Sequence, residues 1–166
     1  MNDGEAEIKI YADGAAFLAE NQALLDTNPQ ISAFMALDAP LLKETGKINY
    51  AVKCERNGKT LLAMKVEPYH LQLFGDADCA GELLDFLTRE GYEVRNYLSE
   101  KTLGDAAARE MEARFGVRYE EALAMAFMEA RTLTEPSSPE VEAANEGDLD
   151  EIYACMERFL VDCNLQ

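Results

Sequence analysis

The middle of the chain alternates apolar and polar side chains in two runs that predict a β-hairpin. The runs cover residues 49–56 and 59–66, and Asn57 and Gly58 lie between them. Asparagine and glycine tolerate the positive φ angles that a two-residue turn between antiparallel strands requires. An Asn-Gly pair between two such runs is the strongest short-range signal for a hairpin. We therefore expect two antiparallel strands joined by a tight turn.

A third strand and a helix are expected directly after the hairpin. Residues 70–74 form another short apolar run, and residues 75–78, Gly-Asp-Ala-Asp, then interrupt the pattern. Over residues 80–89, leucine and phenylalanine side chains recur at the spacing of a helix. Together with the hairpin, these residues predict three antiparallel strands followed by a helix.

Further elements are expected on both sides of this central unit from the same two periodicities. Pro40 interrupts the second of two early helices, so a break near Asp38 is expected. A strand after the central helix should be parallel to the third strand, because a crossover helix joins them. Residues 117–133 contain helix-favouring residue types, yet their alternation and the order of elements favour a strand. The expected strands cover residues 8–11, 93–98 and 117–133, and the expected helices cover residues 15–25, 29–42 and 102–115.

The pattern as a whole predicts an α/β domain of the α+β type over residues 1–134, with a mixed, mostly antiparallel sheet flanked by helices. Two prolines and two serines predict an extended linker at residues 135–139. Beyond it, a strand is expected over residues 140–144 and a helix with a wide apolar stripe over residues 149–163. Residues 140–166 therefore look like the start of a second domain. The stripe is too apolar to face water, so the helix should dock on the first domain or pair with another copy in a homo-oligomer.

Composition and charge narrow the classes of function. The 166 residues include 15 basic and 32 acidic ones, and the resulting net charge of -17 would repel a polyanion, so nucleic acid is not expected as a partner. Four scattered cysteines and a single histidine do not form the clusters that metal sites need, so no metal is expected. The first residues lack the apolar segment of a signal peptide, and no apolar run approaches the roughly 20 residues of a membrane span. We expect a cytoplasmic protein with reduced thiols and no membrane association.

The order of the expected elements resembles that of the GNAT superfamily of N-acetyltransferases: strand, two helices, three antiparallel strands, helix, strand, helix and strand. The tail adds to the likeness, because residues 141–152, Val-Glu-Ala-Ala-Asn-Glu-Gly-Asp-Leu-Asp-Glu-Ile, look like the start of a second domain of this kind. The resemblance implies a tandem protein in which a degenerate N-terminal half precedes a half that carries the cofactor site. It further implies acetyl-CoA as the cofactor and a small-molecule or peptide amine as the acyl acceptor.

The superfamily's motif Q/R-x-x-G-x-G/A lies between the third strand of the central unit and its helix. Glycines there let backbone N–H groups approach the pyrophosphate of acetyl-CoA. Laid on this sequence, the motif places Gly75 at the basic or amide position, Asp78 at the first glycine and Ala80 at the second. Only Ala80 fits, and the carboxylates of Asp76 and Asp78 would repel a pyrophosphate. We therefore expect both aspartates to cap the helix and form the turn, and this half to bind no acetyl-CoA by itself.

Other reactive side chains form no catalytic group in the sequence, and no catalytic residue is assigned. His70 has no acidic partner nearby in the chain, and Tyr97 and Tyr119 are common strand residues as well as potential acids. Cys79 opens a helix, but the flanking aspartates oppose a low thiol pKa, so an inert cysteine is expected. The leading hypothesis is the N-terminal part of an acetyltransferase that serves as scaffold or as part of the acceptor pocket. The alternatives are a GNAT-like interaction module without catalysis and an unrelated acidic α+β domain.

Overall fold

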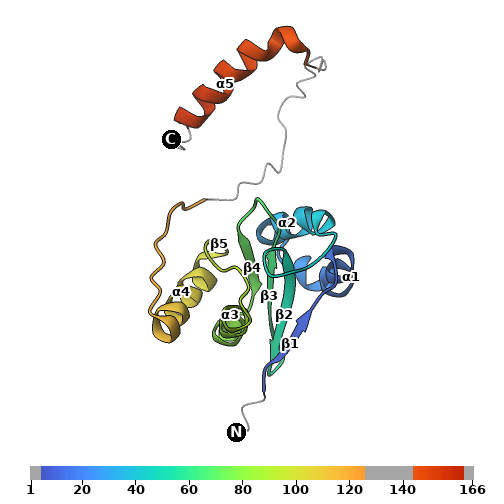
Figure 1. The fold of residues 1–166 in the computed structure, drawn as a ribbon, viewed down its shortest axis with the longest axis vertical. Helices are drawn as coiled ribbons and strands as arrows, with labels where there is room; N and C mark the ends of the chain where they lie inside the picture. The colour runs from blue at the N-terminus through green and yellow to red at the C-terminus, as the bar shows by residue number, and fades with distance from the viewer. Residues whose placement is uncertain (1–4, 126–143, 163–166) are drawn as a thin grey trace. The chain divides into compact units, whose positions relative to one another are not determined.

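The structure is a computed structural model that describes residues 5–125 and residues 144–162. The chain divides into two compact units, residues 1–127 and residues 128–166, and each is described by itself (Figure 1). Across the described residues, no helix is long and apolar enough to cross a membrane.

The first unit is built on a five-stranded sheet with the strand order β1-β2-β3-β4-β5. Neighbouring strands from β1 to β4 pair antiparallel, and β5 pairs parallel to β4. The parallel ladder is short, since it joins only Leu71 to Tyr97 and Gln72 to Leu98. This sheet confirms the expected mixed, mostly antiparallel α+β fold. The strands are β1 (Glu7–Ile10), β2 (Tyr50–Arg56), β3 (Lys59–Lys65), β4 (Leu71–Gly75) and β5 (Tyr97–Leu98).

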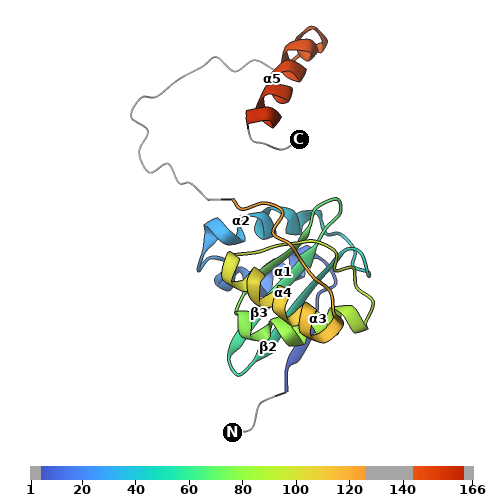
Figure 2. The same cartoon turned by 90° about the vertical axis from the view of Figure 1, so that its left-hand side faces the viewer.

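Helices cover both faces of the sheet, as Figure 1 shows. On one face lie α1 (Gly14–Leu25) and α2 (Pro29–Asp38), and on the other lie α3 (Ala80–Arg89) and α4 (Lys101–Phe115). Figure 2 shows α3 and α4 side by side in front of the strands. Successive residues of a strand point to opposite faces, so the sheet contributes to two apolar cores. The core beneath α3 and α4 includes Val52, Ala63, Leu73, Leu83, Leu84, Leu103 and Met111, and the core beneath α1 and α2 includes Phe17, Leu25, Met35, Ala51, Leu62 and Met64.

The predicted hairpin forms between β2 and β3. Arg56 pairs with Lys59 at the end of the ladder, and the two residues between them have φ angles of 52° at Asn57 and 75° at Gly58. Positive φ at both central residues is the mark of a primed turn, whose twist matches that of the antiparallel strands it joins. The local sequence therefore specifies the turn, because most other residues are strained in this conformation.

The two early helices begin and end close to the predicted positions. The Asp13 carboxylate caps α1 by accepting a hydrogen bond from the N–H of Ala16 at 2.8 Å. The second helix, α2, ends at Asp38, where the chain tightens into the short 3-10 helix η1 (Ala39–Leu41). Pro40 lies within η1 and lacks the N–H that a continuing α-helix would need. The expected break near Asp38 is confirmed.

The strand expected over residues 93–98 is shorter than predicted. The hydroxyl of Tyr50 donates a hydrogen bond of 2.7 Å to the carbonyl oxygen of Glu93. The hydroxyl of Tyr119 donates one of 3.0 Å to the carbonyl oxygen of Val94. In a parallel ladder with β4, residues 93–96 would pair with residues before Leu71, where β4 has not yet begun, so the strand is reduced to two residues.

The strand expected over residues 117–133 is wrong for its described part. Residues 117–125 form neither strand nor helix, and the side chains of Leu123 and Met125 are exposed. At the edge of the sheet, β5 is two residues long and offers a further strand little backbone to pair with. The alternating residues of this segment therefore have no neighbouring strand with which to form a ladder. The rest of this prediction, residues 126–133, lies outside the described residues.

The second unit contains a capped helix. The side chain of Asn145 accepts a hydrogen bond of 2.8 Å from the N–H of Gly147, and Asp148 accepts one of 2.9 Å from the N–H of Asn145. This capping box lies at the 3-10 turn η3 (Glu146–Asp148), which leads into α5 (Leu149–Asp162). The start of the helix at Leu149 was expected from the sequence.

Most of the large apolar side chains of α5 are exposed in the described second unit. Those at the helical spacing that the sequence predicts are Leu149, Ile152, Tyr153, Met156, Phe159 and Leu160, and Val161 is exposed as well. The linker expected at residues 135–139 and residues 140–143 of the strand expected after it lie outside the described residues.

Candidate functional site

The turn between β4 and α3 is the position at which the GNAT resemblance would place a cofactor. It begins at Gly75, the last residue of β4, passes through the 3-10 turn η2 (Ala77–Cys79) and enters α3 at Ala80. In the sheet, β4 lies between β3 and β5. The turn therefore joins the end of an inner strand to the start of a helix.

Gly75 is required by the packing of this turn. Its φ is 127°, and a Cβ atom at this position would lie 2.2 Å from the carbonyl oxygen of Thr60 on β3. The next residue, Asp76, donates its N–H to the same oxygen at 2.7 Å. The end of β4 thus closes against β3 at a distance that a side chain would prevent.

Asp76 and Asp78 contact the β2-β3 hairpin. The Asp78 carboxylate forms an ion pair with Lys59, and this hydrogen-bonded contact lowers the pKa of Asp78. The carbonyl oxygen of Asp78 accepts a hydrogen bond of 2.8 Å from the guanidinium of Arg56. The Asp76 carboxylate accepts a longer one, 3.4 Å, from the N–H of Thr60. Neither carboxylate caps η2 or α3, so the expected capping role is wrong, while both residues do lie in the expected turn.

The backbone donors at the start of α3 are used within the turn itself. The N–H of Cys79 donates to the carbonyl oxygen of Asp76 at 3.2 Å, and the N–H of Ala80 donates to that of Ala77. Ala80, which matches the motif, is completely buried. A helix start binds a phosphate through N–H groups that have no other acceptor. These two donors could therefore serve a ligand only if η2 opened.

A cleft of about 480 Å³ lies between this turn and α4. Its lining contains three arginines and three carboxylates. Arg56 pairs with Glu82, and Arg114 donates to Glu110 at 2.8 Å. Arg109, also on the wall, makes no ion pair within residues 5–125 and 144–161. The charges of the cleft nearly cancel, which suits a polar ligand of small net charge rather than a pyrophosphate.

The arginines of the cleft were not singled out from the sequence. Arg56 ends β2, whereas Arg109 and Arg114 lie on α4, so their proximity depends on how α4 packs on α3. No local spacing connects Arg56 on β2 to the two arginines on α4.

Gln72 is a further residue that was not singled out from the sequence, although a polar side chain within an apolar strand is a recognisable signal. It is a polar residue inside the apolar run of β4, and it is buried. Its Nε2 donates to a carboxylate oxygen of Asp38 at 2.5 Å, while its Oε1 has no hydrogen-bond partner among the described residues. Burying an amide side chain in an otherwise apolar strand costs free energy. Gln72 could therefore have been identified from the sequence as an unusual residue.

The other candidate side chains make structural contacts. Tyr97 and Tyr119 are brought together, with ring centroids 4.9 Å apart, and their hydroxyls donate to backbone carbonyl oxygens. Burial raises the pKa of Tyr97 to about 12. His70 is exposed and makes no hydrogen bond with the part of the chain that the structure describes. Cys79 is buried, and burial raises the pKa of its thiol.

The described residues contain no group of three or more histidine, cysteine, aspartate or glutamate side chains that could hold a metal ion. Comparisons of the chain with protein-family models, with curated proteins and with solved structures found no match. The case for a function therefore depends on the element order and on the contacts of the β4-α3 turn.

Proposed function

We propose that the first unit is a GNAT-like domain that forms the N-terminal part of an acetyl-CoA-dependent N-acetyltransferase. This half serves as a structural scaffold or forms part of the pocket for the acyl acceptor. The order of its elements supports the proposal: β1, two helices, three antiparallel strands, α3, β5 and α4. The parallel pairing of β5 with β4 after a crossover helix supports it as well. The element order is the one that the resemblance implies as far as α4, whereas the strand that should follow does not form over residues 117–125.

The second part of the proposal is that this half does not bind acetyl-CoA. It is supported by the hydrogen bonds at the start of α3. The N–H groups of Cys79 and Ala80 already donate within η2. Asp76 and Asp78 belong to the same turn, and their carboxylates, which contact the β2-β3 hairpin, would repel a pyrophosphate placed there. Two exposed carboxylates near a phosphate cost about 1 kcal/mol each in a solvated setting, enough to weaken binding by roughly tenfold or more.

The second unit supports a tandem arrangement. Asn145 and Asp148 form a capping box at η3, which leads into α5, and residues 141–152 resemble the start of a second domain of this kind. Under this proposal, α5 belongs to a second GNAT-like domain. That second domain would bind acetyl-CoA and transfer the acetyl group to a small-molecule or peptide amine.

Titration of acetyl-CoA into the chain at low ionic strength, followed by calorimetry, tests the proposal. Low salt leaves the charge effects unscreened, so any contribution of the turn is largest there. We expect no measurable binding by the wild type or by Asp78→Lys, which replaces a repulsive charge with an attractive one. A working phosphate site would instead give a micromolar Kd in the wild type and binding roughly tenfold tighter in Asp78→Lys. That result would overturn the scaffold role.

A further inference from the structure

Two cysteines meet in the core beneath α3. Cys54 lies on β2, Cys79 is the last residue of η2, and both side chains are completely buried in the same apolar cluster. The two thiols are close enough to influence each other's pKa. The Cys79 thiol also donates to the carbonyl oxygen of Lys59 at 3.6 Å.

The sheet explains how these two residues come together. Cys54 is directly opposite Leu61 on β3, and Leu61 is directly opposite Gly75 at the end of β4. From Gly75 the chain turns back over β3, because the N–H of Asp76 donates to the carbonyl oxygen of Thr60. This return brings Cys79 over the face of the sheet to which Cys54 points.

We propose that Cys54 and Cys79 are a redox pair whose reversible disulfide fastens the β4-α3 turn to β2. Both thiols are buried in one cluster on the same face of the sheet, so a small movement of the β4-α3 turn could bring them to the S–S bond length of about 2.05 Å. The bond would close a covalent loop that contains the β2-β3 turn and β4. The inference does not depend on the proposed acetyltransferase ancestry, since it involves no cofactor.

The reaction is thiol-disulfide exchange with a small disulfide such as oxidised glutathione. The thiolate of one cysteine attacks a glutathione sulfur, forms a mixed disulfide and releases one glutathione thiolate. The thiolate of the other cysteine then attacks the protein sulfur of the mixed disulfide and releases the second. The protein loses two electrons and two protons, and one oxidised glutathione becomes two reduced glutathione molecules.

The surroundings of the two cysteines indicate which sulfur reacts first and how fast the disulfide forms. Burial raises the pKa of both thiols, that of Cys54 to about 12, so little thiolate is present while the turn is closed. Ala77 and Asp78, the residues just before Cys79, line the open cleft beside α4. Local opening of η2 therefore exposes Cys79 before Cys54, which lies on β2 between β1 and β3. We expect slow oxidation that begins at Cys79.

The test uses the full chain with Cys155→Ser and Cys163→Ser, which leaves Cys54 and Cys79 as its two thiols. The folded protein is incubated with oxidised glutathione, alkylated and digested without reduction. We expect the intact mass to fall by two hydrogen atoms, a linked pair of peptides containing the two cysteines, and a higher thermal midpoint than that of the reduced protein. Dithiothreitol should reverse all three changes.

Adding Cys54→Ser to this variant is the matched control, and it should give no linked peptides and no oxidation-dependent rise in midpoint. Two separate glutathione adducts, two alkylated thiols, or a link that forms only in urea would overturn the proposal. The unaltered chain provides a second measurement if the variants do not fold. It should give the same linked peptides, and their absence under conditions that oxidise the exposed Cys155 would count equally against the pair.

Discussion

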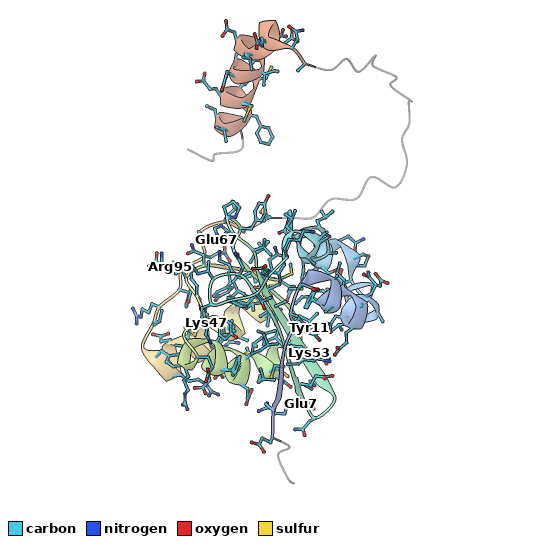
Figure 3. The ribbon with its side chains drawn as sticks, turned by 45° about the vertical axis from the view of Figure 1, so that its right-hand side comes forward. Glu7, Tyr11, Lys47, Lys53, Glu67 and Arg95 are labelled. Carbon is cyan, nitrogen blue, oxygen red and sulfur yellow. The ribbon has the colours of Figure 1, made fainter. Side chains whose placement is uncertain are left out.

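The carboxylate of Glu20 on α1 accepts a hydrogen bond of 2.6 Å from the ammonium group of Lys53 on β2. Lys9 on β1 pairs with the other oxygen of the same carboxylate, so one acidic side chain connects a helix to two strands. Figure 3 shows Lys53 close to Tyr11 beside α1. Hydrogen bonds from Lys53 and Lys9 lower the pKa of Glu20 from 4.5 to about 2. Burial alone would lower the pKa of Lys53, but its bonds to Glu20 and Glu55 raise it above its usual range.

This contact predicts part of the acid sensitivity of the first unit. Because the pKa of Glu20 is lower in the folded protein, its stabilising contribution is present above pH 4.5 and is lost as the pH falls toward about 2. In thermal unfolding at a series of pH values, Glu20→Gln should therefore show a shallower fall in midpoint than the wild type over this window. Glu7→Gln is the control, because Glu7 makes no ion pair with a described residue and should keep the wild-type slope. Equal slopes for Glu20→Gln and the wild type would contradict the assignment.

The hairpin turn predicts a cost that comes from backbone conformation alone. Gly58 has a φ of 75°, and a Cβ atom there would meet no atom within 4 Å. Gly58→Val should therefore lower the free energy of unfolding by about 1 kcal/mol or more, through strain rather than a clash. Gly46→Val is the matched control, because a Cβ at Gly46 also meets nothing within 4 Å and its φ is not in the positive range. An unchanged denaturation midpoint in Gly58→Val would contradict the primed turn at residues 57–58.

The end of β4 predicts a larger effect, because strain and a clash act together. Gly75→Ala places a Cβ 2.2 Å from the Thr60 carbonyl oxygen at a φ of 127°. We expect a loss of about 2 kcal/mol or more in the free energy of unfolding, measured by urea denaturation. Gly91→Ala separates the two causes, since Gly91 has a φ of 74° with nothing within 4 Å and should cost about 1 kcal/mol. Equal losses in the two variants would mean that the contact with Thr60 contributes nothing.

The exposed stripe of α5 predicts self-association of the chain. A large apolar side chain that becomes fully buried contributes roughly 1.5 to 3 kcal/mol, so pairing between copies through this helix is favourable. Light scattering after size exclusion should show a concentration-dependent oligomer, and Phe159→Asp should shift it toward monomer. Glu151→Gln, on the opposite side of the helix, should leave the distribution unchanged. A monodisperse monomer at every concentration, with rapid amide exchange over residues 149–161, would be inconsistent with this prediction.

Local sequence determined the elements whose geometry depends on a few adjacent residues. Asn57 and Gly58 specify the primed turn because the conformational energy of two residues decides it. Asp13 caps α1 because its carboxylate needs to reach only the N–H of Ala16. Pro40 ends α2 because its ring and missing N–H act within one helical turn. For the same reason, the departure of the β4-α3 turn from the GNAT motif could be read directly from Gly75, Asp78 and Ala80.

The tertiary structure decided everything that depends on a partner far away in the chain. The reduced length of β5 follows from the start of β4 at Leu71, which leaves residues 93–96 without a neighbouring strand to pair with. Gly75 is required because Thr60 lies against it, and Asp78 pairs with Lys59 instead of capping a helix. The periodicity of side chains records which face of an element is buried, but not which residue of another element it meets. Those distances are set by how the helices pack on the twisted sheet, and that packing depends on the whole first unit at once.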